Sequence, residues 1–463
     1  MKKAFFAFKL YYLIYILFAF NAFVNETPLM RYGTLLLTAA GLVMVLLMAA
    51  RFRTYLKMYH IWLIGAFLAS YVLSSLMTYR YGITDNAKEI VWLLLTMVFL
   101  YASSYTYTAK EMKQEFCVLS AVWVVYCALA NAVSISMIVW GREYGIEIVS
   151  ETGKLDYKLI GFKWGRLWGI YDDPNHGAVI AVAAIFLALY LMRIMKRKWL
   201  KALWILTIPV QFVYLVLSDS RTGLVTLGVG IFCWCVLLGY SKYKNKGYSP
   251  RKAAAVSILF GFLLACVCIG AAYGAKQQYN RMDKKIVAFF NRGSGSTSAN
   301  KKPSAQVGRK KDLVEDTTNG RFRIWASGLE ITKTRPIFGT SFRNMTVYAQ
   351  ENLPETYLVN NPEGAKYDSL HNSVLDILVS QGVIGIGILL ALIVNMFVLM
   401  KKRIRSVRYE DREFMVICFV LLTSMAAASM FLTLVFYLNA PETYIFWLCF
   451  GYFMAILQKG EDA

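Results

Sequence analysis

The sequence predicts an all-α integral membrane protein with about twelve transmembrane helices and one large extracytoplasmic loop that contains short amphipathic helices. Of its 463 residues, 58% are hydrophobic and 17% are charged, whereas a soluble domain is typically about 45–50% apolar and about 25% charged. The mean hydropathy is also positive, at +0.47. Moreover, the apolar residues gather in runs of the roughly 20 residues that a helix needs to cross a bilayer.

These apolar runs follow one another along most of the chain. The first of them comes directly after Met1-Lys2-Lys3, and its length favours a transmembrane helix over a cleaved signal peptide. We expect spans at residues 5–24, 32–50, 59–78, 89–106, 116–140, 174–192, 199–218, 221–240, 252–274, 373–400, 413–436 and 441–457.

Lysines and arginines indicate how the spans are oriented. They cluster in the connections after spans two, four, six, eight and ten, and Lys2 and Lys3 precede span one. Since basic loops stay in the cytoplasm, both termini are expected there, and the other connections are expected outside. The net charge of +22 is therefore interpreted as cytoplasmic loop charge, and no nucleic-acid partner is expected.

The chain is predicted to have three parts. Residues 1–274 hold spans one to nine, residues 275–372 form the large extracytoplasmic loop, and residues 373–463 hold spans ten to twelve. Within the loop, 293–319 is rich in Ser, Gly, Lys and Asp and is interpreted as a flexible insert. Gly320–Thr334 has apolar residues at helical spacing and predicts an amphipathic helix at the outer membrane surface, ended by Pro336.

Two candidate groups lie on the predicted outer side before the large loop. At the start of span six, Asp173 and Pro174 are typical of a helix cap and a first helical residue, which leaves Arg166 and Asn175 unexplained. Between spans seven and eight, Ser220 is a candidate cap, with Arg221 in the first helical turn. A cation there opposes the helix dipole.

The Arg221 pattern has two interpretations. One is a snorkelling arginine paired with Asp219, and the other is an anion site built at a helix N-terminus.

Two further groups lie in the large loop. Arg321 and Arg323 are on the predicted amphipathic helix. The segment from Asp368 to Asn372 leads into span ten, so that His371 lies at the start of a helix. It is on the same predicted outer side of the membrane as the arginines. Histidine has a pKa suited to a general base near neutral pH.

In chain order these residues resemble the O-antigen ligase and polymerase superfamily of polytopic membrane glycosyltransferases. The resemblance covers roughly residues 160–400 and the order of spans. The usual Asn-x-x-Gly is shortened here to Asn175-His176-Gly177. The matching pieces are Arg166, Asp173-Pro174-Asn175, Ser220-Arg221-Thr222-Gly223, Gly320-Arg321-x-x-x-Trp325, Pro336-x-Phe338-Gly339, His371-Asn372-Ser373, Asp376 and Gly382-x-x-Gly385.

The resemblance implies transfer of a glycan from an undecaprenyl-diphosphate-linked donor to an acceptor hydroxyl, with no cofactor and no metal. Arginine suits a diphosphate leaving group because its charge is fixed and its geometry bidentate. Arg221 and Arg321 are therefore expected on the diphosphate, with Arg166 as a third contact, and His371 as general base. The other expected substrate-binding residues are Asn175, Arg323, Trp325, Asn372 and Asp368.

Several alternatives stay open at this stage. A polymerase and a ligase share these motifs and differ in the acceptor, which is a glycan, a lipid or the cell wall. The expected location is the bacterial cell membrane with an extracytoplasmic active site, and a flippase and a chain-length regulator are candidate partners. The alternative from another class is a transporter or flippase for lipid-linked oligosaccharide, which would place polar groups at mid-membrane.

Overall fold

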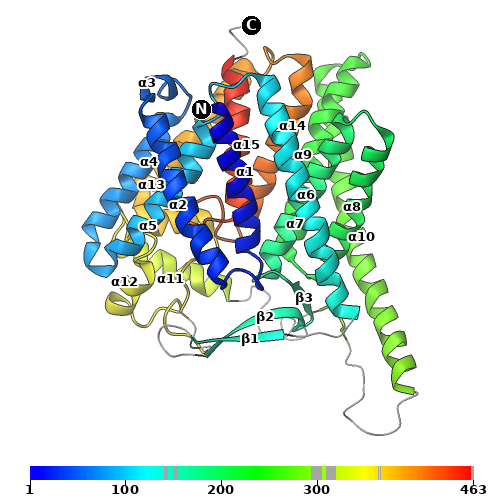
Figure 1. The fold of residues 1–463 in the computed structure, drawn as a ribbon, viewed down its shortest axis with the longest axis horizontal. Helices are drawn as coiled ribbons and strands as arrows, with labels where there is room; N and C mark the ends of the chain where they lie inside the picture. Colours follow the sequence, from blue (N-terminus) through cyan, green and yellow to red (C-terminus); the bar gives the residue numbers. More distant parts are fainter. Residues whose placement is uncertain are drawn as a thin grey trace. The chain divides into compact units, whose positions relative to one another are not determined.

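The computed structural model describes residues 1–139, 144–149, 155–292, 305–308, 320–362, 364 and 366–459 (Figure 1). Most of these residues are helical. The helices are α1 (Lys2–Ala19), α2 (Pro28–Ala49), α3 (Phe52–Tyr55), α4 (Ile61–Met77), α5 (Ile83–Leu93) with a π-helical continuation (Leu94–Leu100), α6 (Ala109–Val139), α7 (Pro174–Ile194), α8 (Lys198–Leu217), α9 (Arg221–Asn245), α10 (Pro250–Arg292), α11 (Arg321–Thr334), α12 (Met345–Asn352), α13 (Ser373–Arg403), α14 (Arg412–Ala428) and α15 (Pro441–Lys459). Short 3-10 turns lie at Tyr79–Tyr81 and Tyr409–Asp411.

The chain forms two compact units, and each is described by itself. The first unit comprises Met1–Leu13, Thr34–Glu115 and Asp316–Ala463, and the second comprises Ile14–Gly33 and Phe116–Glu315. The candidate residues divide between them. Arg166, Asn175 and Arg221 belong to the second unit, and the candidates from Arg321 to Asn372 belong to the first.

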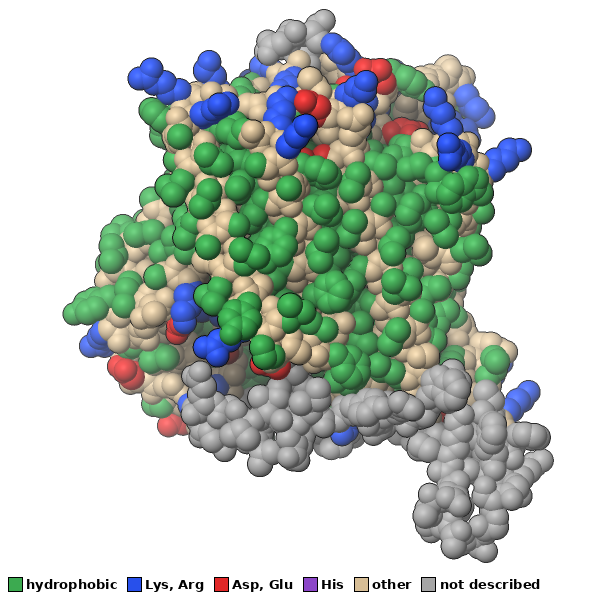
Figure 2. All heavy atoms as spheres, viewed as in Figure 1, with side chains coloured by type: hydrophobic (Ala, Val, Ile, Leu, Met, Phe, Trp, Pro, Cys, Tyr) green, Lys and Arg blue, Asp and Glu red, His purple; other side chains and the backbone are tan. Residues whose placement is uncertain are grey.

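Each of the twelve predicted spans overlaps a helical segment. Within the described residues, seven helices are long and apolar enough to cross a membrane, namely α2, α6, α7, α8, α9, α10 and α13. Hydrophobic side chains cover the visible sides of the helices (Figure 2), and among the large exposed ones are Leu46, Leu206 and Val267. Soluble proteins rarely expose apolar surface so widely, so the chain is a multi-pass membrane protein; that all twelve segments cross stays a prediction.

Two helix ends differ clearly from the predicted ones. α14 ends at Ala428, so the last third of the span expected at 413–436 is non-helical. Residues in that third are nevertheless buried, Leu434 completely. α10 runs on to Arg292, well beyond residue 274, where the large loop was expected to begin. Apolar content alone did not locate these ends because buried irregular backbone and long helices can be equally apolar.

A small antiparallel sheet corrects the all-α prediction. Its strands are β1 (Tyr144–Val149), β2 (Leu155–Lys163) and β3 (Arg166–Gly169), in the order β1-β2-β3. Tyr144 pairs with Ile160 and Val149 with Leu155. The strands follow α6 in the chain and precede α7 (Figure 1). The period-2 spacing of apolar residues in YGIEIV is the signal that could have predicted β1.

The predicted flexible insert, 293–319, lies almost wholly outside the described residues. Its described part, residues 305–308, is held in place rather than loose. The Gly308 N–H donates to the carbonyl of Gly165 over 2.9 Å, and Val307 is buried and hydrogen-bonded through its backbone to Asn280. This short segment therefore packs on the turn between β2 and β3.

In the first unit, α13 is broken at Gly382, where φ is +62°. Backbone of the segment that follows α11 fills the break. Thr340 and Ser341 donate their N–H groups to the carbonyls of Val379 and Ser380, and Val383 donates to Pro336, each over 2.9 Å. Broken backbone at membrane depth requires such protein partners.

Glycines allow these two backbone segments to come so close. At Gly339, which has φ of +67°, a Cβ atom would collide with the backbone of Val379, and at Gly382 with that of Ile337. Gly339 and Gly382, from the motifs Pro336-x-Phe338-Gly339 and Gly382-x-x-Gly385, are thus explained by close approach of two backbones.

Candidate functional site

His371 occupies a strained position at the start of α13. Its φ is +50°, a left-handed conformation that costs a non-glycine residue roughly 1–2 kcal/mol. Hydrogen bonds hold the residues on both sides. The Leu370 N–H donates to Oδ1 of Asp376 over 2.8 Å, and Oδ1 of Asn372 accepts from the N–H groups of Val374 and Leu375 at 3.0 and 3.2 Å.

Irregular backbone after α14 completes this support. Oδ2 of Asp376 accepts from the Thr433 hydroxyl over 2.8 Å, and Nδ2 of Asn372 donates to the Met430 carbonyl over 3.2 Å. Asp376 is completely buried and Asn372 nearly so. Asn372 is therefore a helix cap, a role the sequence did not assign to it. His371 itself is half-buried, and its ring meets Tyr367 edge-on with centroids 6.3 Å apart.

The predicted amphipathic helix is present as α11, and one of its faces packs against Leu370, the residue before His371. Trp325 donates its indole N–H to the Leu370 carbonyl over 2.9 Å, and a Cβ on Gly328 would come within 2.5 Å of the Leu370 side chain. Arg321, Trp325 and Gly328 share a face because they are four and three residues apart. The face that carries Arg321 thus packs beside the residue that precedes His371.

A second face of α11 is exposed and apolar. Phe322 and Leu329 are 62% and 47% exposed, whereas Ile324 and Ile331 are buried. Exposed apolar residues on a charged helix are typical of one that lies at a membrane surface. Arg323 is exposed as well, with its guanidinium 5.5 Å from the centroid of Tyr357.

In the second unit, Arg166 is nine-tenths buried at the start of β3. Its Nε donates to the Ser218 carbonyl over 2.7 Å, and its Nη2 donates to Oδ1 of Asn175 over 2.8 Å. The Ser220 hydroxyl donates to the same Asn175 oxygen over 3.0 Å. One guanidinium and one amide therefore tie β3 to the start of α7 and to the turn between α8 and α9.

The predicted helix caps of this cluster are confirmed. Asp173 accepts from the Asn175 N–H over 2.6 Å with Pro174 at the first helical position, and the Ser220 hydroxyl accepts from the Gly223 N–H over 3.1 Å. Arg221, by contrast, is exposed in the first turn of α9. Asp219 forms an ion pair of 2.6 Å with Lys276, a partner that the snorkelling interpretation did not include.

Two glycines of the cluster allow helices to approach closely. A Cβ on Gly177 would collide with the hydroxyl of Tyr214, and one on Gly223 would lie 2.7 Å from the Cβ of Ala178. Gly177 and Gly223 therefore bring α8 and α9 against α7, which places the Ser220-Arg221 turn beside Asn175.

The sequence did not predict an ion pair that joins α5 to the loop before α12. Arg343 donates from Nε and Nη2 to one oxygen of Glu89, at 2.8 and 2.6 Å. Glu89 is 1% exposed. Arg343 also lines a cavity of about 360 Å³ together with Asp85, Lys88, Trp92, Phe342, Thr346 and Asp368. Asp368 is thus the only candidate residue on the walls of this cavity, a few residues before His371.

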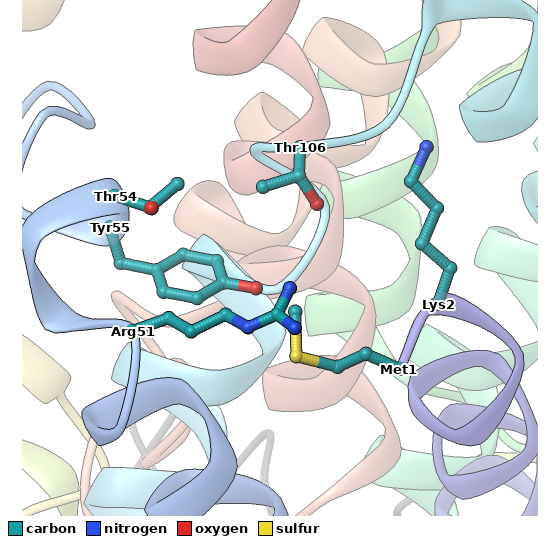
Figure 3. Close-up of a pocket in the computed structure, with 6 residues that line it drawn as sticks. All are labelled: Met1, Lys2, Arg51, Thr54, Tyr55 and Thr106. Carbon is teal, nitrogen blue, oxygen red and sulfur yellow. The ribbon is translucent and has the colours of Figure 1, made fainter.

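Another cavity of the first unit, of about 310 Å³, contains none of the candidate residues. Arg51 and Tyr55 extend from one wall toward Met1 (Figure 3), with Lys2, Thr54 and Thr106 as the other lining residues. All belong to connections predicted to be cytoplasmic, so this cavity is set aside. Within the described residues, no three His, Cys, Asp or Glu side chains gather as metal ligands would.

Comparison with known families agrees with these motifs. A family model described as O-Antigen ligase (Wzy_C) matches residues 206–390. Residues 206–390 are therefore similar to the O-antigen ligase family, which supports the superfamily that the motifs indicate. A search of curated proteins found no match.

The O-antigen ligase region contains most of the candidate site. Arg221, Arg321 and His371 fall inside the matched residues, together with the broken part of α13. Arg166 and Asn175 precede the matched region. Those two residues are attached to the matched region by their hydrogen bonds to Ser218 and Ser220.

Proposed function

We propose that this protein transfers a glycan from an undecaprenyl-diphosphate-linked donor to an acceptor hydroxyl on the outer face of the cell membrane. The observation that carries the proposal is the placement of His371. His371 has a left-handed conformation, and hydrogen bonds of its neighbours Leu370 and Asn372 hold the backbone on both sides of it. Backbone strain of this kind often marks functional sites. The family match supports the same class of reaction.

His371 acts in this proposal as the base that activates the acceptor hydroxyl. A base in position contributes typically about 10²–10⁴-fold to the rate. Arg321 stabilises the negative charge that develops on the diphosphate. It is suited to this role because the face of α11 that carries it packs against Leu370, the residue before His371. Asn372 orients His371 through the helix cap, and Arg323 and Trp325 contribute to substrate binding on the same helix.

Arg221 supplies the second cation for the leaving group. It is exposed at a helix N-terminus, where backbone N–H groups also favour anions. The buried Arg166 and Asn175 hold the turn that presents it. That Arg221 and Arg321 serve one donor stays a prediction, as do the extracytoplasmic side and the cytoplasmic termini.

Buried charges bear on the transporter alternative. Lys9 and Glu115 form an ion pair of 2.6 Å in the first unit, with both side chains buried. Lys9 also donates to Ser104, and Glu115 accepts from Tyr452. Because the two charges neutralise each other and are satisfied by protein groups, the pair does not require a transported ligand, and the glycosyltransferase remains the favoured function.

Transfer in proteoliposomes tests the function directly. The purified protein is incubated with a lipid-linked repeat unit, and the products are separated by size. A ladder identifies a polymerase, which we favour slightly, and a single transfer product identifies a ligase. Absence of any product beyond that of heat-inactivated protein would contradict both.

A further inference from the structure

The cavity lined by Asp368 has the size of a ligand pocket. Its volume of about 360 Å³ lies within the range of about 300–1,000 Å³ that is usual for small-molecule sites. The walls carry two aromatic rings, Trp92 and Phe342, and five polar side chains, of which four are charged. This lining is more polar than that of most small-molecule sites, so it suits a ligand rich in hydrogen-bonding groups.

The walls of this cavity are rigid. Phe342 is 5% exposed and stacks on Tyr437 with centroids 4.7 Å apart. The Thr346 hydroxyl donates to the Tyr367 carbonyl over 2.8 Å, and the Tyr367 N–H donates to the Leu358 carbonyl over 3.2 Å. The residue next to Asp368 is thus anchored on both sides, so that Asp368 has a defined place on the wall.

Arg343 is held by a buried carboxylate. Both of its hydrogen bonds to Glu89 come from Nε and Nη2, so the other terminal nitrogen has no described partner and the side chain stays 37% exposed. The second oxygen of Glu89 is buried and has no hydrogen-bond partner among the described residues. A guanidinium fixed in this way is pre-organised to donate to a ligand.

The charges of the walls favour a neutral ligand with hydroxyl groups. Lys88 and Arg343 are balanced by Asp85 and Asp368, and Glu89 behind Arg343 adds a negative charge. A diphosphate would meet two carboxylates here. A sugar, in contrast, offers hydroxyls that donate to Asp368 and accept from Arg343, and a ring face that packs on Trp92.

The position of the cavity distinguishes the acceptor from the donor. His371 follows Asp368 by three positions in the chain, and such a segment spans at most about 11 Å. An acceptor whose hydroxyl meets His371 can therefore reach the cavity with the same or the next sugar. Arg321 and Arg221, assigned to the diphosphate, are absent from its walls.

We propose that this cavity binds one sugar of the acceptor glycan, stacked on Trp92 and hydrogen-bonded to Asp368 and Arg343. The inference rests on the proposed transfer to an acceptor hydroxyl and names where that acceptor is recognised. Trp92 and Arg343 then determine which acceptor is used, while His371 determines how fast it reacts.

The first test measures binding without turnover. The probe is a repeat-unit oligosaccharide released from the host polysaccharide by mild acid, and its binding to the full-length protein in nanodiscs is followed by saturation-transfer NMR. Wild type and His371→Asn should bind it, and Trp92→Leu and Asp368→Asn should weaken binding roughly tenfold, as expected for loss of an anchoring contact. Unchanged affinity in both cavity variants, or no binding by wild type, overturns the proposal.

Matched controls come from the same unit. Trp62→Leu removes a tryptophan that is 70% exposed and outside the cavity. Glu355→Gln removes an exposed carboxylate of the same loop. Both should bind the probe as wild type does, and unchanged thermal unfolding of all four variants excludes loss of folding as the cause.

The second test uses transfer kinetics with the same oligosaccharide as soluble acceptor. The cavity variants should raise the KM for acceptor roughly tenfold and leave kcat and the KM for donor unchanged. A raised KM for donor instead would assign the cavity to the donor glycan and overturn the proposal. If the wild type forms no transfer product, the proposed function fails, and the NMR result still decides whether the cavity binds a sugar.

Discussion

The polar clusters around Arg166 and around His371 differ in whether the side chain or the neighbouring backbone is held by hydrogen bonds. Around Arg166 the cation is buried and its bonds go to Ser218 and Asn175. Around His371 the functional side chain is half-exposed, and it is the backbone on either side that is bonded. The first arrangement fixes where helices begin, and the second leaves a side chain available to substrate.

The comparison shows that burial separates positioning from chemistry. An arginine whose donors are engaged by protein has little left to offer a diphosphate, whereas an exposed one such as Arg221 can approach it. Substitutions should therefore affect stability in one cluster and rate in the other.

Replacing His371 should have the largest effect on rate. His371→Asn removes the base but keeps a residue type that tolerates the left-handed conformation. Transfer should slow by about 10²–10⁴-fold with donor binding retained, as measured by single-turnover transfer and by competition with a lipid diphosphate. A wild-type rate from folded His371→Asn would remove the histidine from the mechanism.

Replacing Arg221 should weaken donor engagement. Arg221→Gln should lower the rate by about 10²–10³-fold, as found for loss of one charge-stabilising donor, and reduce inhibition by a lipid diphosphate. The melting temperature should stay the same because the side chain is exposed. Arg281→Gln, an exposed arginine of α10, is the matched control and should change neither property; equal losses in both variants would indicate a non-specific charge effect.

Replacing Arg166 should reduce stability. Arg166→Met removes the donor to the Ser218 carbonyl and one of the two donors to the Asn175 oxygen, and the free energy of unfolding should fall by roughly 1.5–3 kcal/mol for each hydrogen bond lost. Thermal unfolding in detergent measures this loss. A folded Arg166→Met with unchanged melting temperature but weakened diphosphate competition would return Arg166 to the direct substrate contacts.

Two helix caps give the finest comparison. Asn372→Ala and Asp173→Ala should each cost about 0.5–2 kcal/mol of stability. Asn372→Ala should also lower the rate, since the cap holds the backbone beside His371, while Asp173→Ala should change mainly the melting temperature. Similar rates in the two variants would mean that the cap at α13 has no part in catalysis.

Much of the candidate site was predictable because its signals are local. Ser220 and Asp173 cap their helices through neighbours two or three residues away, and α11 shows helical spacing within fourteen residues. The buried face of α11 was less predictable. The helical spacing of Phe322, Trp325 and Leu329 predicts one apolar stripe, yet Ile324 and Ile331 are the buried residues. Which face of the helix is buried depends on the residues that pack against it.

Apolar runs and local motifs were enough to predict the membrane class, the helical segments, the resemblance to the O-antigen ligase superfamily and the order of the candidate residues. Tertiary structure decided the rest, because the deciding contacts join residues far apart in the chain. Arg343 and Glu89, 254 residues apart, form a wall of the cavity that local spacing cannot indicate. The break in α13 is stable only with the backbone around Pro336 inside it. Arg166 was predicted to contact substrate, and its burial against Ser218 and Asn175 favours a role in holding the helices in place.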